Sequence, residues 1–448
     1  MAWRGPSWRP RGHGRAGPAC QTGAMLQATA RRLAAFSGPF RLLLISDSLM
    51  LLSLMVGRVA TPWWVAHEGG AAHLALFAGG LALGSCLALP LLSPLGDRLD
   101  KKLLISAGLA LMALEALLLA SLAQAGFYRL HWVMALELLS VVAMAAIMPA
   151  SFSIVAELLP PSQLTEGLGL QKSAQAIGRL LGPALGGAVL ALAGTAAALW
   201  LHAVLLALAA ALAWRVQTPA LRPQAHARHW LRELRAGLAA KWKMPLERGW
   251  TTVSFLVMVF FGPAIGMLVP LKVQSLGLSG AWLGACEAGL SAGMLLGSLG
   301  GAVWLAERMG RFRASLTAIL VEGLCMAVIG VSHQGLVIVL CFAVLGACIS
   351  TVQLVGHTHR MLAIPQAYRS RLMAVNLMVM HIAGVLGPGL AGLGLLRLGV
   401  DWIYLLFGLG LFLVGLAYRW VPGYRDFLNL PHEQAEGWYA RQHPQLFR

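Results

Sequence analysis

Long apolar stretches alternate along this chain with short polar or Pro/Gly-containing segments. A helix that crosses a hydrocarbon core of about 30 Å needs roughly 20 apolar residues. Twelve stretches reach that length, which predicts an all-α integral membrane protein with twelve transmembrane helices. The predicted spans are 41–64, 71–93, 103–124, 131–154, 167–193, 196–214, 250–271, 281–304, 314–332, 335–356, 372–396 and 401–420.

One longer polar connection, between the sixth and seventh spans, divides the chain into two six-helix halves. Tryptophan and leucine recur there at helical spacing among basic residues, from His229 to Trp242. This favours an amphipathic helix on the inner membrane surface, although a solvated linker helix fits equally well. The expected organisation is a disordered basic segment (1–36), an N-terminal six-helix bundle (37–214), a cytoplasmic linker (215–249), a C-terminal six-helix bundle (250–421) and a cytoplasmic tail (422–448).

The distribution of charged residues predicts how the helices are oriented in the membrane. Only 11% of the 448 residues are charged, against about 25% in soluble domains, which excludes a soluble enzyme. With the N-terminus inside, 28 of the 34 Lys and Arg fall on the cytoplasmic side and three on the other side, and three lie within spans. Short cytoplasmic loops retain positive charge, so we expect both termini in the cytoplasm. The net charge of +17 is therefore a topology signal with some affinity for anionic lipid, not a sign of nucleic-acid binding.

An internal repeat relates the two halves. Gly182-Pro183 and Gly387-Pro388 are 205 residues apart, and so are Pro160 and Pro365 in the preceding loops. At an offset of 210, the loop sequence Gly96-Asp97-Arg98 recurs as Ala306-Glu307-Arg308. Matching acidic-Arg loops after the second helix of each half indicate two parallel repeats about an axis along the membrane normal.

These loops resemble those of the major facilitator superfamily, and the likeness covers roughly residues 36–421. The stretch from Ser93 to Lys102 is similar to the family's loop motif, with Asp100 at a position where glycine is usual. The resemblance implies a twelve-helix transporter in which Asp97 and Arg98, with Glu307 and Arg308 in the second half, latch one conformation. The alternative is that these residues serve only as positive-inside charge.

The fifth span carries a second motif, which looks like the family's antiporter motif and occurs mainly in exporters. Its members are Gly178, Gly182, Pro183, Gly186 and Gly187, and Gly387 and Pro388 repeat part of it. Glycines four apart form a smooth groove that admits another helix, and the proline kinks its own helix. The first and fourth spans look like the branch that holds enterobactin-type siderophore exporters and multidrug exporters, so the resemblance favours export.

Ionisable residues inside spans cost about 2.5 to 3.5 kcal/mol each on insertion scales, so each needs a partner, a cavity or a function. Asp47 and Arg58 lie three turns apart, about 16 Å, and cannot pair directly. Lys172, Gln175 and Arg179 form a polar stripe that would attract an anion to a central cavity. Alternatively, Lys172 snorkels to the surface, and Glu137 or Asp47 neutralises Arg179.

Glu137 is the first candidate for proton coupling, because burial and a nearby cation would compete for its proton. Asp47 and His381 are the further candidates. In the second half, Glu287 and Asn376 join Arg58 and the polar stripe as candidates for lining the substrate cavity.

No catalytic set, nucleotide-binding loop or metal-ligand spacing is present in the sequence, so we expect no cofactor and no metal. The expected protein is a monomeric, proton-coupled exporter of a small organic molecule in a bacterial inner membrane, with a siderophore as the favoured substrate. Multidrug efflux and lysophospholipid flipping are alternatives within the same fold. A non-transporting sensor or a lipid-modifying enzyme is the alternative of another class.

Overall fold

The computed structural model describes residues 36–92, 99–217 and 230–446, and the secondary-structure elements in these ranges are all helical. The N-terminal half contains α2 (Gly38–Leu92), α4 (Lys101–Gln124), α5 (Leu130–Leu158) and α6 (Pro161–Arg215). Among these residues and those of the second half, ten helices are long and apolar enough to cross a membrane. Two of the ten, α2 and α6, have 55 residues each, which is twice the length that one crossing needs.

Both long helices turn back on themselves at a glycine. Gly70 in α2 has φ 64° and Gly194 in α6 has φ 83°, a conformation that side-chain-bearing residues rarely adopt. These glycines separate the predicted spans 41–64 and 71–93, and the predicted spans 167–193 and 196–214. Each long helix thus supplies two spans, and the predicted twelve-helix architecture in two six-helix halves is confirmed.

The C-terminal half is more finely divided. Its spans comprise α8 (Pro245–Gly266), α9 (Leu268–Ser275), α10 (Gly280–Leu296), η1 (Gly297–Gly301), α11 (Ala302–Met309), α12 (Arg311–Val331), α13 (Gly335–Val352), η2 (Gln353–His357), α14 (Thr358–Ala363), α15 (Gln366–Leu395), α16 (Val400–Leu416) and η3 (Ala417–Trp420). Within the predicted span 250–271, α8 ends and α9 begins on either side of Met267. Pro270 has no N–H to donate to the turn before it, so the helix is interrupted there.

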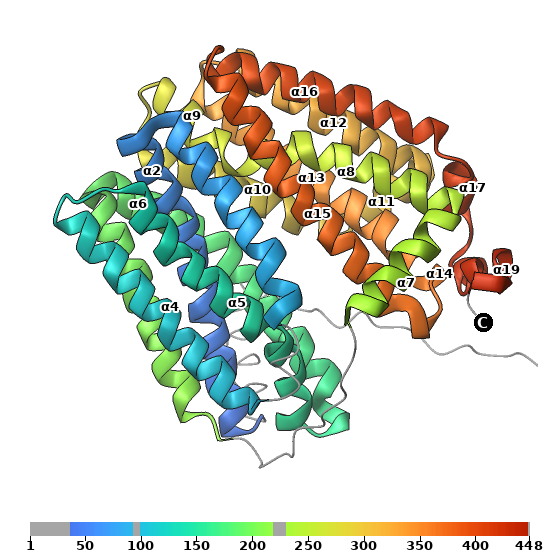
Figure 1. Ribbon diagram of the computed structural model, residues 1–448, viewed down its shortest axis with the longest axis horizontal. Helices are drawn as coiled ribbons and strands as arrows, with labels where there is room; N and C mark the ends of the chain where they lie inside the picture. Colours follow the sequence, from blue (N-terminus) through green and yellow to red (C-terminus); the bar gives the residue numbers. More distant parts are fainter. Residues whose placement is uncertain (1–35, 93–98, 218–229, 447–448) are drawn as a thin grey trace, which may run out of the picture.

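Short helices cover one end of the second half. They are α7 (Trp230–Lys243) in the linker and, in the tail, α17 (Tyr424–Asn429), α18 (His432–Ala435), α19 (Trp438–Gln442) and η4 (Pro444–Leu446). Figure 1 shows the two bundles side by side, with the turn of α2 and α9 at one end and α7, α14 and α19 at the other. The end that carries Gly70, Gly194 and α9 is here named the closed end, and the opposite end is named the open end.

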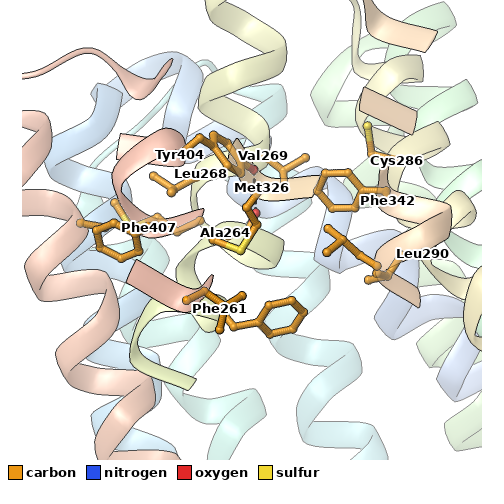
Figure 2. Packing of buried hydrophobic residues seen from close by; sticks show 14 of the residues in the cluster. Phe261, Ala264, Leu268, Val269, Cys286, Leu290, Met326, Phe342, Tyr404 and Phe407 are labelled. Atoms are coloured by element: carbon orange, nitrogen blue, oxygen red, sulfur yellow. Dashed lines mark hydrogen bonds between the residues drawn. The ribbon is translucent and has the colours of Figure 1, made fainter. Parts of the chain in front are cut away.

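Two buried apolar clusters hold the bundles together. The larger one joins both halves near the closed end, for example through Leu190 and Leu283, and fills the second bundle. Figure 2 shows part of it, with Phe261 of α8 and with Tyr404 and Phe407 of α16 among the labelled side chains; the Tyr404 hydroxyl donates to the carbonyl oxygen of Ala264 at 2.6 Å. The smaller cluster lies within the N-terminal half alone. The two halves therefore share a core at the closed end.

Candidate functional site

The two halves meet at the closed end through small residues. A Cβ added to Gly187 of α6 would lie 2.6 Å from the Cα of Gly284 of α10, so the two backbones are in direct contact. On the other flank, a Cβ on Gly392 of α15 would lie 2.4 Å from the Cβ of Ala75 of α2. Side chains of any size would hold these helices apart, so glycine is required for this contact. These contacts are named the glycine seam.

The other glycines of the antiporter-like motif and of its repeat pack against a helix of their own half. Gly178, Gly182 and Gly186 face the first span around Leu52 and Val56, while Gly387 faces Val259 and Pro263 of α8. Pro183 and Pro388 lie inside their helices directly after Gly182 and Gly387. The repeat seen in the sequence thus corresponds to equivalent helix packing in both bundles.

An ion pair crosses the interface one turn beyond the seam. The Nη2 atom of Arg58 in α2 lies 3.9 Å from the Oε2 atom of Glu287 in α10. The Arg58 side chain is 46% exposed and that of Glu287 is 9% exposed, so the arginine also reaches into open space. The structure brings together two residues that the sequence proposed separately, and it gives Arg58 a partner in the opposite half.

A cavity of about 580 Å³ opens between the halves beyond this ion pair. Along α10, the residues Gly284, Glu287 and Ser291 follow at intervals of three or four, so one helix face supplies the seam, the ion pair and then the cavity wall. This space is named the central cavity. Its lining residues are Ala176, Arg179, Ser291, Met294, Leu295, Ser298, Ser350, Gln353, Leu354, His357, Thr358, Met361 and Leu362.

Two π-helical segments form part of this wall. The segment η1 supplies Ser298, and η2 supplies Gln353 and His357. They belong to α-helices that pack side by side, where a Cβ on Gly297 would lie 2.6 Å from the Cβ of Ser350. Such π-bulges are rare and occur frequently at functional sites. These segments were not predicted, although the glycines around Gly297 are a weak signal of irregular backbone.

The polar stripe of the fifth span is only partly directed at the central cavity. Arg179 is exposed and lines it, while Lys172 lies exposed two turns nearer the open end and Gln175 is half-buried. Asp47 is buried and accepts a hydrogen bond from Nε2 of Gln171 at 2.5 Å. Gln171 was not predicted as this partner, because a charged group was expected to pair with Asp47.

A second cavity, of about 530 Å³, lies in the N-terminal half and holds Glu137. Arg58, Thr61, Ser140 and His202 are among its other lining residues. Ser140 also donates to a carboxylate oxygen of the buried Glu115 at 3.0 Å, which places a second acid beside this cavity. His202, which the sequence analysis missed, is buried with its Nδ1 atom 2.7 Å from Ser53 Oγ.

Two of the candidate residues, Asn376 and His381, lie in α15, which is the eleventh span. Asn376 accepts a hydrogen bond from the ammonium group of Lys241 in α7, so it belongs to the open end and not to the central cavity wall. The Nε2 atom of His381 is buried, and it has no hydrogen-bond partner within the described part of the chain.

A buried ionic cluster, which no sequence signal indicated, ties the linker and the tail to the second half. Arg360 donates to both carboxylate oxygens of Glu247, at 2.9 and 2.5 Å, and Lys241 lies 3.4 Å from the same carboxylate. The hydroxyl of Tyr439 in α19 donates to Glu247 at 2.7 Å. Burial and the nearby Arg360 lower the pKa of Lys241 to about 7, although Glu247 acts in the opposite direction. Together these four residues are named the open-end cluster.

The latch candidates are divided between described and undescribed parts of the chain. Asp97 and Arg98 lie outside the described residues. Glu307 is exposed and lines a separate pocket, and the Arg308 guanidinium lies 4.6 Å from the ring centroid of Trp304. Asp100, the residue that departs from the family pattern, caps α4 by accepting the backbone N–H of Leu103 at 2.8 Å.

Solved structures with a similar fold include transporters. A point mutant of the nucleoside transporter NupG is 13% identical and superposes with a TM-score of 0.72, covering 86% of this chain and 100% of that one. NupG without the mutation is 14% identical, with a TM-score of 0.64 and coverage of 86% and 99%. A bacterial homolog of the human lysosomal transporter Spinster, in an inward-facing and unoccupied conformation, is 14% identical, with a TM-score of 0.61 and coverage of 89% and 98%. At these identities the likeness concerns the fold alone.

Comparison at the level of sequence gives the family. No curated protein matches the chain. The profile of the Major Facilitator Superfamily matches residues 43–321 and 302–441, which together cover most of the chain. The chain therefore belongs to the major facilitator superfamily and is a multi-pass membrane transporter rather than an enzyme.

Proposed function

We propose that this protein is a proton-coupled secondary transporter that exports a small organic anion, with a siderophore as the favoured class. The observation that carries the proposal is Arg179, an exposed cation in the wall of a cavity that opens between the two halves. A guanidinium in a low-dielectric cavity attracts carboxylate or catecholate oxygens and binds them through charge-assisted hydrogen bonds. His357 and Gln353 add hydrogen-bonding groups on the opposite wall.

In this proposal Glu137 couples transport to protons through Arg58. Both side chains line the same cavity, and Arg58 also pairs with Glu287 across the interface. An ionised Glu137 attracts Arg58 toward the N-terminal half and weakens the pair with Glu287. A protonated Glu137 leaves Arg58 to Glu287, which favours the closed seam. Proton binding thereby biases the contact between the halves, as coupling requires.

The variant Arg179→Ala tests whether the substrate is an anion. Binding of a carboxylate-bearing substrate should weaken roughly tenfold to a hundredfold through loss of one charge-assisted bond. A cationic drug should bind almost as before, and Arg215→Ala, at the far end of the same helix, should affect neither substrate. Binding and counterflow in proteoliposomes measure both effects. Equal losses for anionic and cationic substrates would contradict an anionic cargo.

Multidrug efflux is a second candidate, because apolar side chains form much of the central cavity wall. Met294, Leu295, Leu354, Met361 and Leu362 present a flexible apolar surface suited to varied amphiphiles. Two results together would favour this candidate over anion export. Different cationic amphiphiles would compete with one another for binding, and Arg179→Ala would leave their affinities unchanged.

The variant Glu137→Gln tests whether this residue couples transport to protons. This variant should lose uphill export driven by a pH gradient and yet retain measurable substrate binding, because the amide cannot release a proton. Parental export by the variant in proteoliposomes would remove Glu137 from the coupling mechanism.

We further propose that the open end faces the cytoplasm of a bacterial inner membrane, with both termini inside. The support is the excess of Lys and Arg in the connections at that end. In a background without native cysteines, an impermeant reagent should label Ala72→Cys from outside the cell and Asp100→Cys only after the membrane is opened. The reverse pattern would contradict this orientation.

A further inference from the structure

A groove of about 320 Å³ lies at the open end of the second half, separate from the central cavity. The linker helix α7 forms one wall, and the first turns of α8 and the middle of α15 form the others. Its residues are Leu238, Lys241, Trp242, Arg248, Thr251, Thr252, Phe255, Val375, Val379 and Ile382. None of them lines the central cavity or the cavity around Glu137. The groove is therefore a separate place from the proposed cargo site.

The apolar part of the groove continues onto an outward face of the bundle. Ile382 is 37% exposed, and Met378 and Leu386, four residues away on either side, are 43% and 47% exposed. Residues at this spacing share one helix face. None of the three lines the central cavity or the cavity around Glu137, so this exposed apolar face is assigned to contact with hydrocarbon, and the groove then opens to the acyl chains of the bilayer.

The other part of the groove is cationic and aromatic. The Arg248 side chain is exposed, and its guanidinium lies 6.0 Å from the ring centroid of Trp242, which is itself 64% exposed. Arg235 and Lys243 of α7 are exposed nearby in the sequence. Tryptophan with basic residues at the end of an apolar span is typical of the level of lipid headgroups.

The floor of the groove is fixed in place. Lys241 lines it and is bonded to Asn376 and to Glu247 of the open-end cluster. These contacts hold α7 against α8 and α15, so the groove is a formed site and not a gap beside a loose helix.

We propose that this groove binds one anionic glycerophospholipid, whose acyl chain lies beside Phe255 and Ile382 and whose phosphate contacts Arg248. Charge complementarity selects an anionic headgroup over a zwitterionic one, because the exposed charged side chain that lines the groove is the Arg248 guanidinium. The bound lipid fastens α7 to the second half, while the central cavity remains free for cargo.

The experiment is a titration of the purified full-length protein with phosphatidylglycerol or phosphatidylcholine, read by native mass spectrometry and by thermal unfolding. Wild type should retain one tightly bound phosphatidylglycerol and unfold at a higher temperature with it. Arg248→Gln should weaken this binding roughly tenfold and leave phosphatidylcholine binding unchanged. Arg419→Gln, which removes another exposed cation at the same end, is the matched control and should behave as wild type.

A second variant tests the groove without changing charge. Val379→Trp should fill the apolar part and displace the bound lipid, while Arg248 remains. Equal affinity for the two lipids, parental binding by both groove variants, or an equal loss in Arg419→Gln would each overturn the proposal. The last result would indicate a diffuse basic surface and not a site.

Discussion

The same two helices, α6 and α10, behave differently at the two ends of the interface between the halves. At the closed end their backbones touch through Gly187 and Gly284. Toward the open end they separate around the central cavity, where Arg179 and Ser291 face open space. The seam is small, backbone to backbone, and backed by one long ion pair, that of Arg58 with Glu287. A contact of this kind can form and break without moving many charged side chains between water and the protein interior. This suits an interface that must open during transport.

The largest expected effect comes from breaking the seam. Gly187→Leu places a side chain where even a Cβ would lie 2.6 Å from Gly284, so the halves cannot close and transport should be abolished. Gly169→Leu on the same helix is the matched control, because no atom lies within 4 Å of the Cβ position at Gly169. Counterflow in proteoliposomes measures both. Parental rates in Gly187→Leu would show that closure at this point is not part of the cycle.

The ion pairs at the open ends of the two halves differ in burial. Removing one carboxylate from each half tests whether this difference affects stability. In the second half, Glu247→Gln leaves Arg360 and Lys241 buried without their counter-charge, and should lower the free energy of unfolding by about 3 to 5 kcal/mol. In the first half, Glu157→Gln removes the partner of Lys101 in an ion pair whose side chains are 26% and 18% exposed, and should cost about 1 kcal/mol or less. Unfolding in mixed micelles measures the difference. Equal costs would mean that burial does not distinguish the two clusters.

A smaller effect follows from the titration of Lys241. Its pKa is lowered in the folded protein to about 7 from the ordinary value of 10.5, because the ammonium is buried beside Arg360. Between these values the unfolded chain binds more protons, so this group makes the folded state more stable as pH rises from 7, by at most about 1.4 kcal/mol per pH unit. Lys241→Met should flatten the rise in unfolding temperature between pH 7 and 9. An unchanged slope would show that Lys241 remains charged throughout.

Most of the fold could be predicted from the sequence because the bilayer fixes the length of an apolar helix. The turns at Gly70 and Gly194 lie where the apolar stretches ended, and the repeated Gly-Pro pairs lie in equivalent helices. The break at Met267 was missed because one apolar stretch covers both α8 and α9. Apolar composition reports burial in lipid and does not report a local loss of helical hydrogen bonds.

The site was less predictable, for two physical reasons. Partners of the buried groups are far apart in the sequence: Glu247 and Arg360 are 113 residues apart, and Glu247 and Tyr439 are 192 apart. No periodicity links such residues. The π-helical segments η1 and η2 depend on how α10 and α13 pack, which a single helix sequence does not reveal. Arg179, by contrast, could be proposed from the sequence because a cation inside an apolar span needs a cavity, a partner or a function, and it lies in the wall of the central cavity.

The most direct test of alternating access measures both ends of the interface at once. Spin labels at the exposed positions Ala191 and Ala281 report the closed end, and labels at the exposed positions Glu166 and Met309 report the open end, again across α6 and α10 or α11. On addition of substrate with a pH gradient, we predict that the closed-end distance lengthens in the same population in which the open-end distance shortens. Distances that both stay fixed, or that change in the same direction, would contradict a transporter that opens its central cavity to one side at a time.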